Sequence, residues 1–397
     1  FPQEGETVPK RRFKEFEGEW VESKLGDIVE ITMGHSPKSS SYTNDATNCI
    51  LVQGNADMKK NRVTPRIWTT QVTKIANKND LILTVRAPVG EIGKTDYDVV
   101  LGRGVAGLKG NEFIFQYLIK LKMEDYWVRV STGSTFDSVS SDDINEVNLF
   151  VPKHEEQQKI GEFFKVLDDR IANQERKIAK VKALKSAYLT EMFPQQGETV
   201  PKRRFAGFKG DWKEMCLGDL SDSFDYGLNA ESKKYDGENK YIRITDIDDD
   251  TRLFVKNNLT SPNIDYPISD RYILDEGDIL FARTGASVGK TYRYNKLDGK
   301  VYYAGFLIKA TIKDEHDYEF IFQNTLTKKY ENFVYITSQR SGQPGINAQE
   351  YATYKLMIPT LEEQQKIGQF FKNLDDEITT EEKKLEKLKK MKEAYLE

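Results

Sequence analysis

A long charged segment with a regular apolar stripe occurs twice and constrains the fold more than any other feature of the chain. The copies are EEQQKIGEFFKVLDDRIANQERKIAKVKALKSAYLTEMF at 155–193 and EEQQKIGQFFKNLDDEITTEEKKLEKLKKMKEAYLE at 362–397. Apolar residues recur three or four positions apart, glutamates open each copy, and lysines gather in its later turns, which is typical of a long amphipathic helix. A lone helix of this kind would leave its stripe in water, so we expect the two copies to cover each other as a coiled coil. The expected seam comprises Ile160, Phe164, Leu167, Ile171, Ile178, Val181, Tyr188, Ile367, Phe371, Leu374, Ile378, Leu385, Leu388 and Tyr395.

A second segment is also repeated: one copy opens the chain, and the other follows the first long helix. Phe1 begins FPQEGETVPKRRFKEFEGEW, and Phe193 begins FPQQGETVPKRRFAGFKGDW. The sequence therefore predicts two tandem units, each a globular part followed by a helix. We expect a first domain at 1–152, a first spacer helix at 153–192, a second domain at 193–359 and a second spacer helix at 360–397.

Connectivity predicts the direction in which the two helices pair. The first helix runs directly into the second globular part, which must end where the second helix starts. Parallel helices would place those two points about 50 Å apart at about 1.5 Å per residue. Antiparallel helices would place them side by side, as domain termini usually are. We therefore expect two domains on an antiparallel two-helix spacer with a pseudo-twofold relation.

Within the globular parts, apolar runs and turn signals alternate irregularly, which indicates an α/β (α+β) fold with both strands and helices in each domain. In the first domain we expect strands at 25–33, 49–53, 81–85 and 147–151, and a helix at 113–123. In the second domain we expect strands at 217–224, 241–244 and 278–282, and a helix near 319–326.

Composition excludes several classes of protein. The formal net charge of −4 does not by itself indicate a nucleic-acid partner. Two cysteines, Cys49 and Cys216, exclude a disulfide framework and a cysteine-rich zinc site, and they suit a reducing, cytoplasmic location. No apolar run is long enough to span a bilayer, and we expect no secretory leader.

Motifs for catalysis or cofactor binding are weak. Residues 102–107 fit G-x-G-x-x-G, but Gly110 interrupts before any helix begins, so a tight turn is the better interpretation than a dinucleotide site. The acidic run DIDDD at 246–250 favours a solvated turn over a cation site. The chain has three histidines and no P-loop motif, so we expect no metal, no bound cofactor and no catalytic residue in this chain.

Polar and basic loops recur at matching places in the two units and suit nucleic acid. Lysines and hydroxyls contact phosphate, arginine pairs with guanine, and Asn or Gln pairs with adenine. The candidate DNA-binding residues of the first unit are His35, Ser36, Lys38, Ser39, Ser40, Tyr42, Lys59, Lys60, Arg62, Arg86, Lys94, Arg103, Ser134 and Thr135. Those of the second unit are Tyr226, Asn229, Lys233, Lys234, Tyr235, Arg243, Thr245, Arg283, Thr284, Lys290, Arg340, Ser341 and Gln343.

Arg86 and Arg283 are the most similar of these candidates, because each follows an apolar strand and precedes a glycine-containing turn that leads to Lys94 or Lys290. A salt bridge within the domain is the alternative interpretation for each arginine. The opening arm contains the cluster Lys10-Arg11-Arg12, which could contact phosphate. Its aromatic residues are expected to pack the arm onto the domain or the neighbouring helix.

Four sequence elements, each present in both units, resemble one known family. They are the arm with its LGD end at 13–27 and 205–219, the GDIL-type turns near Asp80 and Asp278, the TGST and SGQ loops, and the V/IPxxEEQQKIGxFF helix start. Together they are similar to the specificity subunit of type I restriction–modification systems over essentially the full length. The resemblance implies two target-recognition domains, each reading one half of a split, asymmetric DNA site. It also implies a complex with two modification (methyltransferase) subunits and with restriction (motor-nuclease) subunits, which would bind S-adenosylmethionine, ATP and magnesium.

The expected mechanism is that the paired helices act as a ruler and place the two domains about one helical turn of DNA apart, roughly 10 bp. Their outer faces are expected to bind the methyltransferases. Two alternatives remain at this point. One is a coiled-coil adaptor that binds protein through both domains, and the other is part of a single-chain restriction–methylation enzyme, for which no methyltransferase domain is found.

Overall fold

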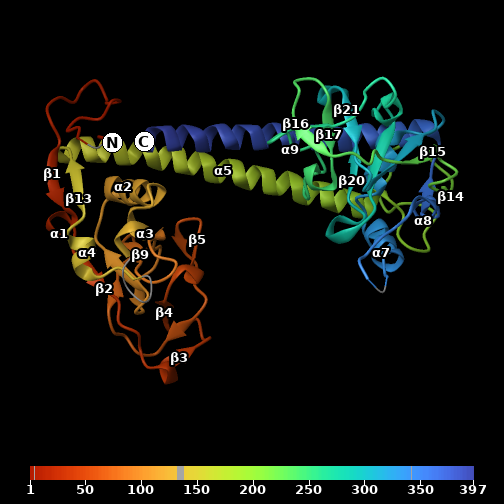
Figure 1. Ribbon diagram of the computed structural model, residues 1–397. Coiled ribbons are helices and arrows are strands. Elements are labelled where there is room, and N and C mark those ends of the chain that lie inside the picture. Colours follow the sequence, from red (N-terminus) through yellow and green to blue (C-terminus); the bar gives the residue numbers. More distant parts are fainter. Residues whose placement is uncertain (4, 132–137, 341) are drawn as a thin grey trace. The chain divides into compact units, whose positions relative to one another are not determined.

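Two long helices, α5 (His154–Met192) and α9 (Leu361–Leu396), each contribute to two separate units of the chain (Figure 1). The computed structural model describes residues 1–397 except 4, 132–137 and 341. Unit 1 comprises Phe1–Glu175 and Lys384–Glu397, and unit 2 comprises Arg176–Lys383. In the described part of the chain, no helix is both long and apolar enough to cross a membrane.

The helices pair antiparallel in each unit. In unit 1, Phe163 near the start of α5 packs on Tyr395 near the end of α9, with ring centroids 5.0 Å apart. In unit 2 the order is reversed, since Tyr188 near the end of α5 packs on Phe370 near the start of α9, again at 5.0 Å. The predicted antiparallel pairing is therefore confirmed within each unit.

The predicted apolar stripe is buried or half-buried at all its positions, but it has more than one partner. Phe164 packs into the core of unit 1, and Ile367, Phe371 and Leu374 pack into the core of unit 2. The stripe therefore not only joins the two helices but also attaches each helix to a domain.

The opening arm of each unit packs on the helix start. Phe1 lies against Phe113 and Phe164, and Phe193 lies in the same way against Phe320 and Phe371. The expectation that aromatic residues hold the arm in place is confirmed. In unit 1 the arm also reaches the other end of the chain, because Gln3 Nε2 donates to the carbonyl of Glu397 at 3.3 Å.

A pair of antiparallel strands closes the base of each domain. In unit 1, β1 (Val21–Lys24) pairs with β13 (Asn148–Val151). In unit 2, β14 (Lys213–Cys216) pairs with β23 (Lys355–Ile358). The first and last strands of each domain therefore lie side by side, and the last strand leads into the long helix.

The described residues of unit 1 form two further sheets and four short α-helices besides this strand pair. The sheet orders are β2-β12-β9-β10-β6-β5 and β3-β7-β4-β11-β8. The strands of the first sheet are β2 (Ile31–Met33), β12 (Val105–Leu108), β9 (Leu81–Thr84), β10 (Ile92–Lys94), β6 (Arg62–Val63) and β5 (Met58–Lys59). The strands of the second sheet are β3 (Tyr42–Thr43), β7 (Trp68–Thr69), β4 (Cys49–Val52), β11 (Val99–Leu101) and β8 (Ile75–Ala76). The helices are α1 (Leu25–Ile28), α2 (Glu112–Met123), α3 (Tyr126–Ser131) and α4 (Ser141–Asn145).

In unit 2, leaving out residue 341, a four-stranded sheet corresponds to β2-β12-β9-β10 of unit 1, and two strand pairs and three short α-helices accompany it. The sheet order is β15-β22-β19-β20, and the pairs are β16 with β18 and β17 with β21. The sheet strands are β15 (Ser221–Tyr226), β22 (Leu307–Ile312), β19 (Asp278–Ala282) and β20 (Thr291–Arg293). The paired strands are β16 (Ser232–Lys234), β18 (Thr260–Pro262), β17 (Lys240–Ile242) and β21 (Val301–Tyr303), and the helices are α6 (Tyr318–Asn324), α7 (Lys328–Thr337) and α8 (Ala348–Ala352).

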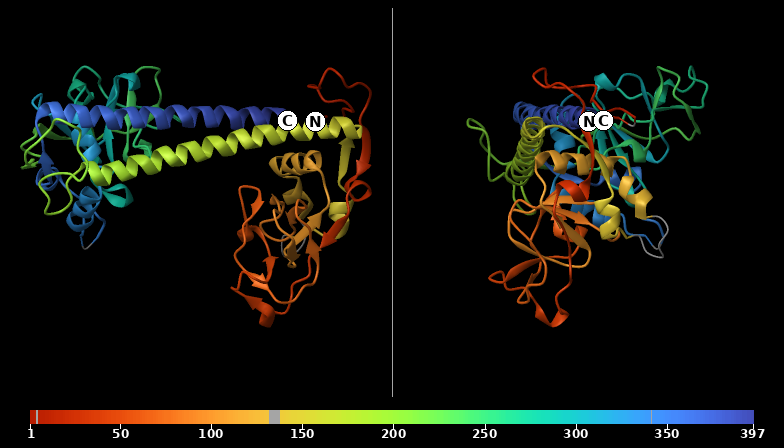
Figure 2. Two further views of the ribbon diagram at one scale, coloured as in Figure 1. Left: turned by 180° about the vertical axis from the view of Figure 1, so that it is seen from behind. Right: turned by 90° about the vertical axis from the view of Figure 1, so that its left-hand side faces the viewer.

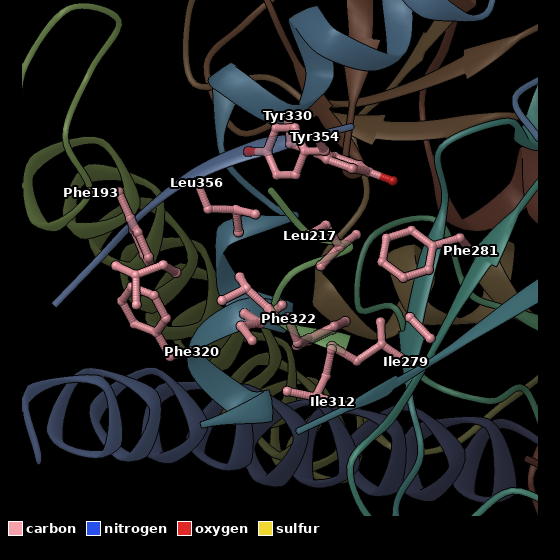
Figure 3. Packing of buried hydrophobic residues seen from close by; sticks show 14 of the residues in the cluster. Phe193, Leu217, Ile279, Phe281, Ile312, Phe320, Phe322, Tyr330, Tyr354 and Leu356 are labelled. Atoms are coloured by element: carbon pink, nitrogen blue, oxygen red, sulfur yellow. The ribbon is translucent and has the colours of Figure 1, made fainter. Parts of the chain in front are cut away.

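The main core of unit 2 joins its sheet to its helices. Ile279 and Phe281 of β19 pack with Phe320 and Phe322 of α6 in one apolar cluster, which Figure 3 shows together with Leu356 of β23. Burial of these side chains is the main favourable contribution to folding of the unit.

The strand predicted at 25–33 is wrong in its first half. Residues Leu25–Ile28 form one helical turn, and only Ile31–Met33 are a strand. Leu25 is fully buried and its amide donates to the carbonyl of Val147, so the chain must turn here to bring that side chain inward. The strand predicted at 217–224 likewise begins only at Ser221.

Candidate nucleic-acid interface

The repeated EEQQKIG motif attaches each domain to the start of its helix. The second glutamate of the motif, Glu156 or Glu363, is buried and accepts two hydrogen bonds from an arginine of the arm, Arg12 or Arg204. These bidentate pairs have distances of 2.6–2.8 Å, and such paired contacts are both strong and specific in geometry. One arginine of each basic cluster is therefore a structural residue.

The glutamine and glycine of the same motif bring a second helix close to each long helix. Gln157 Nε2 donates to the carbonyl of Pro152, and its Oε1 accepts from Asn111, which caps α2. At Gly161 a Cβ atom would lie 2.7 Å from the Cβ of Glu112. Figure 2 shows the resulting close packing of α2 along the first turns of α5. Gln364 and Gly368 make the equivalent contacts with α6 in unit 2.

A chain of five polar side chains then connects each domain to both long helices, and we call it the relay. In unit 1, Lys94 pairs with Glu112, and Gln116 Nε2 donates to Glu112 at 3.2 Å and to Asp168 at 2.8 Å. Lys392 of α9 completes the relay by donating to Asp168 at 2.6 Å.

Unit 2 contains the same relay with different residues. Arg293 pairs with Glu319 at 2.9 Å, and Gln323 Nε2 donates to Glu319 at 3.0 Å and to Asp375 at 2.8 Å. Lys185 of α5 donates to Asp375 at 2.6 Å. Burial raises the pKa of the Glu319 carboxyl, and the charge of Arg293 opposes that shift. Both relays therefore hold a domain on the helices.

At the ends of β15 and β19, three backbone segments of unit 2 converge. The amide of Gly227 after β15 donates to Leu307 at 3.0 Å, and the amide of Arg283 after β19 donates to the carbonyl of Phe306 at 3.0 Å. The amide of Gly305 donates to Leu228 at 2.8 Å. We call the side chains presented here the strand-end surface of unit 2. They are Tyr226, Arg283, Thr284, Phe306 and Gln343.

The side chains of this surface combine positive charge with aromatic rings. The Arg283 guanidinium lies 4.8 Å from the ring centroid of Tyr226, and the Tyr226 hydroxyl accepts from the amide of Ala348 at 3.2 Å. Gln343 is exposed and lies over Gly285, where a Cβ atom would come within 2.8 Å of its Nε2 atom. Arginine held by stacking and an exposed amide are side chains that can read base edges.

The equivalent surface of unit 1 has the same backbone and different side chains. The amide of Gly34 donates to Val105 and the amide of Val85 donates to Gly104, both at 2.9 Å. We call His35, Ser36, Arg86 and Arg103 the strand-end surface of unit 1; the Arg103 amide donates to Ser36 Oγ at 3.0 Å. A cavity of about 440 Å³ lies between Arg86 and Arg103. Its lining residues are Met33, Val85, Arg86, Arg103, Val130, Ser131, Ser138, Val139, Ser140 and Asp143.

The two arginines that the sequence placed in matching contexts do not occupy equivalent positions. Arg86 bridges to Ser138, whereas in unit 2 the matching bridge joins Thr284 to Gly345. Arg283 is equivalent to Val85. The amide of each donates to the carbonyl of the residue just before the neighbouring strand of the sheet, which is β22 in unit 2 and β12 in unit 1. Both arginines lie at the strand-end surfaces, and no salt bridge of either is found among the described residues.

Lys94 and Lys290, which follow these arginines in the sequence, are not equivalent to each other either. Lys94 corresponds to Arg293, since each pairs with the first glutamate of the following helix and lies over a phenylalanine ring. Lys290 is buried, donates to the carbonyl of Ile247 and pairs with Asp249. Both lysines are thus engaged in contacts within their domains.

Several other candidates lie outside the strand-end surfaces. Lys60 pairs with Glu175 of α5, Arg62 pairs with Asp96, and Arg243 makes a bidentate pair with Asp246. Arg340 pairs with Glu350 beside the surface of unit 2. Lys38, Ser39, Ser40, Lys59, Asn229, Lys233, Lys234 and Thr245 are exposed, while Tyr42 and Tyr235 are half-buried. Ser134, Thr135 and Ser341 lie outside the described residues.

Phe306 was missed by the sequence reasoning. It belongs to the apolar run VYYAGFLIK, in which its neighbours Tyr303 and Leu307 are fully buried. The Ala-Gly pair before it marks a turn and was the one signal in the sequence, because a turn can expose a residue that the composition of the run would bury.

No group of potential metal ligands is found among the described residues. The acidic run is used locally, because Asp246 pairs with Arg243, Asp248 accepts from the amide of Thr251, and Asp249 pairs with Lys290. Gly102 and Gly104 form the tight turn between β11 and β12, and a Cβ atom at Gly104 would lie 2.0 Å from the carbonyl oxygen of Gln53.

Comparison with known proteins agrees with this arrangement. A family model described as the type I restriction modification DNA specificity domain matches residues 17–183 and again residues 209–390. The type I restriction enzyme MjaIX specificity subunit of Methanocaldococcus jannaschii is 22% identical over 95% of this chain and 92% of its own length. The putative MjaX specificity subunit of the same organism is 31% identical, but the match covers 42% of this chain and 41% of that protein.

Two solved structures share the fold. The S subunit of a type I restriction–modification system from M. genitalium aligns with a TM-score of 0.67 over 98% of this chain and 97% of its own, at 16% identity. A chain solved for complex assembly and conformational transition of the type I R-M system aligns with a TM-score of 0.52 over 95% and 96%, at 17% identity.

The fold defines a class of proteins in which one chain carries two related domains, each followed by a long helix. Since the family model matches most of the chain in two copies, the chain belongs to the family of type I restriction–modification DNA specificity subunits.

Proposed function

We propose that each unit reads one half of a bipartite, asymmetric DNA target and that the chain itself catalyses no reaction. The observation that supports this most directly is the contrast between the two strand-end surfaces. The same backbone presents Arg86, Arg103 and Ser36 in unit 1 but Tyr226 and Arg283 in unit 2. Two such surfaces would select two different base sequences.

The chemistry of these side chains suits base recognition in the major groove. Arginine donates two hydrogen bonds to guanine, and the amide of Gln343 can pair with adenine in the same bidentate way. Exposed lysines such as Lys38 and Lys233 would contact phosphates and fix the register of the protein on the duplex.

In this proposal the paired helices set the gap between the half-sites, and their exposed faces bind two methyltransferase subunits. Restriction subunits with motor and nuclease activity would join the same complex. S-adenosylmethionine, ATP and magnesium would be bound by those partners, and this chain would bind no cofactor.

Exchange of one domain tests the modular part of the proposal. Replacing residues 25–150 with the matching segment of another specificity subunit should change one half of the methylated sequence and leave the other half unchanged. The measurement is methylome sequencing of a host that carries the chimaera with its methyltransferase. A change in both halves would contradict independent reading by the two units.

The alternative is a coiled-coil adaptor that binds protein through both domains. A gel-shift series with the full chain and its methyltransferase at several salt concentrations distinguishes the two. DNA binding should weaken steeply with salt, because each phosphate contact releases counterions. An adaptor would give no shifted DNA at any salt concentration.

A further inference from the structure

Phe306 is an exposed aromatic side chain on a rigid turn of the strand-end surface of unit 2. It is 60% exposed, and it lies between Ala304 and Leu307 at the turn from β21 to β22. The amide of Leu307 donates to Ala304 at 2.8 Å, which closes the turn. The carbonyl of Phe306 accepts from the amide of Arg283. The backbone of this residue is therefore fixed although its ring lies in water.

In the described part of unit 1, no aromatic ring occupies the equivalent turn. The equivalent residue is Gly104. Its carbonyl accepts from the amide of Val85, just as the carbonyl of Phe306 accepts from the amide of Arg283. A side chain at Gly104 would collide with the carbonyl oxygen of Gln53. An apolar contact from this turn is thus available to unit 2 and sterically excluded in unit 1.

The neighbours of Phe306 point to the type of ligand. Other apolar residues of unit 2 are more exposed, such as Leu297 at 86%, so exposure alone does not identify a contact. Phe306 differs because its backbone is bonded to Arg283, whose guanidinium is held over Tyr226. Arg283 and Phe306 adjoin the paired residues Ala282 and Leu307, so an arginine and an apolar side chain leave opposite positions of neighbouring strands. Such a pair matches a base-pair edge that offers an apolar group next to acceptors.

We propose that Phe306 contacts the C5-methyl group of a thymine in the half-site read by unit 2, next to the base that Arg283 contacts. This inference rests on the proposed DNA-reading function. In the major groove the thymine methyl is the apolar group on the base edges, and phenylalanine is one of the side chains that contact it. The ring of Phe306 carries no hydrogen-bonding group, so it can select thymine only through that methyl.

Replacing thymine with uracil removes the methyl group alone and tests the contact. We use the full chain assembled with its methyltransferase subunits, and duplexes in which each thymine of the unit 2 half-site is replaced singly. At one position the parent should bind uracil about fourfold more weakly, which corresponds to the burial of one methyl group. Phe306→Ala should bind both duplexes equally at that position, and Leu297→Ala should discriminate as the parent does.

Three results would overturn the inference. The parent could bind uracil as well as thymine at every position, or Phe306→Ala could retain the discrimination. Alternatively, a 2-aminopurine probe beside the contacted step could brighten on binding of the parent but not of Phe306→Ala without any effect of uracil, which would make Phe306 a wedge between bases. Failure of the proposed function is a separate result, namely that the parent complex prefers no sequence in either half-site.

Discussion

At the scale of single residues, the two strand-end surfaces carry different side chains on a similar backbone. The turn after the third sheet strand spans 85–91 in unit 1 and 283–290 in unit 2, so it is one residue longer in unit 2. Arg86 and Arg283 therefore leave the sheet at successive positions rather than at the same one. The two arginines would therefore approach the base pairs from different positions relative to the sheet.

Arg283→Ala should weaken binding at one base pair of the target by about 1–3 kcal/mol, because a bidentate contact to guanine would be lost. The measurement is binding of the complex to a panel of duplexes with single substitutions in the unit 2 half-site. Arg243→Ala is the matched control, since Arg243 is already paired with Asp246 and should not change base preference. A uniform loss for all sequences would instead identify Arg283 as a phosphate contact.

The sequence predicted Arg86, Arg103 and Arg283 after apolar strands, and the structure places them just after β9, β11 and β19, whereas Tyr226 is the last residue of β15 and not a loop residue. The sequence did not separate these arginines from Lys94 and Lys290, which have the same charge and lie a few residues further on. Their ion pairs with Glu112 and Asp249 depend on long-range packing. No local pattern in the sequence indicates such pairs.

At the scale of secondary-structure elements, the relays attach the short helices α2 and α6 to the long helices α5 and α9. Gln116 and Gln323 each bridge two carboxylates and have no charge of their own. Without the amide, two buried or half-buried acids would lose a donor, and unsatisfied groups of this kind are costly in a protein interior.

Gln323→Ala should lower the stability of α6 packing in unit 2 by about 1–3 kcal/mol. Hydrogen exchange followed at peptide resolution should show faster exchange in α6 and unchanged exchange in α2. Gln116→Ala should give the reverse pattern. Gln369→Ala serves as the control, because its bond to Asn373 is exposed and its loss should change stability by less than about 0.5 kcal/mol. Equal effects on both helices would argue against separate relays.

The long helices and the arms were predicted well, because the repeat and the apolar period are local properties of the sequence. A seam between the two helices alone is too narrow an interpretation of the apolar stripe. Phe164 and Phe371 have the spacing of a coiled-coil seam, yet they lie in the domain cores. Periodicity identifies the buried face of a helix but not the partner that buries it.

At the scale of the whole molecule, the proposed ruler makes a prediction about length. Inserting one heptad after Glu175 and another after Lys383 should lengthen the paired helices by about 10 Å, or about three base pairs. The methylated motif should keep both half-sites and contain a longer gap, which methylome sequencing measures. Inserting a heptad in one helix alone should disrupt the pairing and abolish methylation. An unchanged gap after the double insertion would contradict the ruler.

Each relay ends on a lysine from the helix that follows the other domain. Lys392 completes the relay of unit 1, and Lys185 completes that of unit 2. These lysines occupy the same place in the repeat, as do Asp168 and Asp375. A single ancestral half could therefore have formed both relays by pairing with its own copy as a homodimer. Such a homodimer would be limited to palindromes, whereas gene duplication and fusion would let the two halves diverge and recognise unlike sequences.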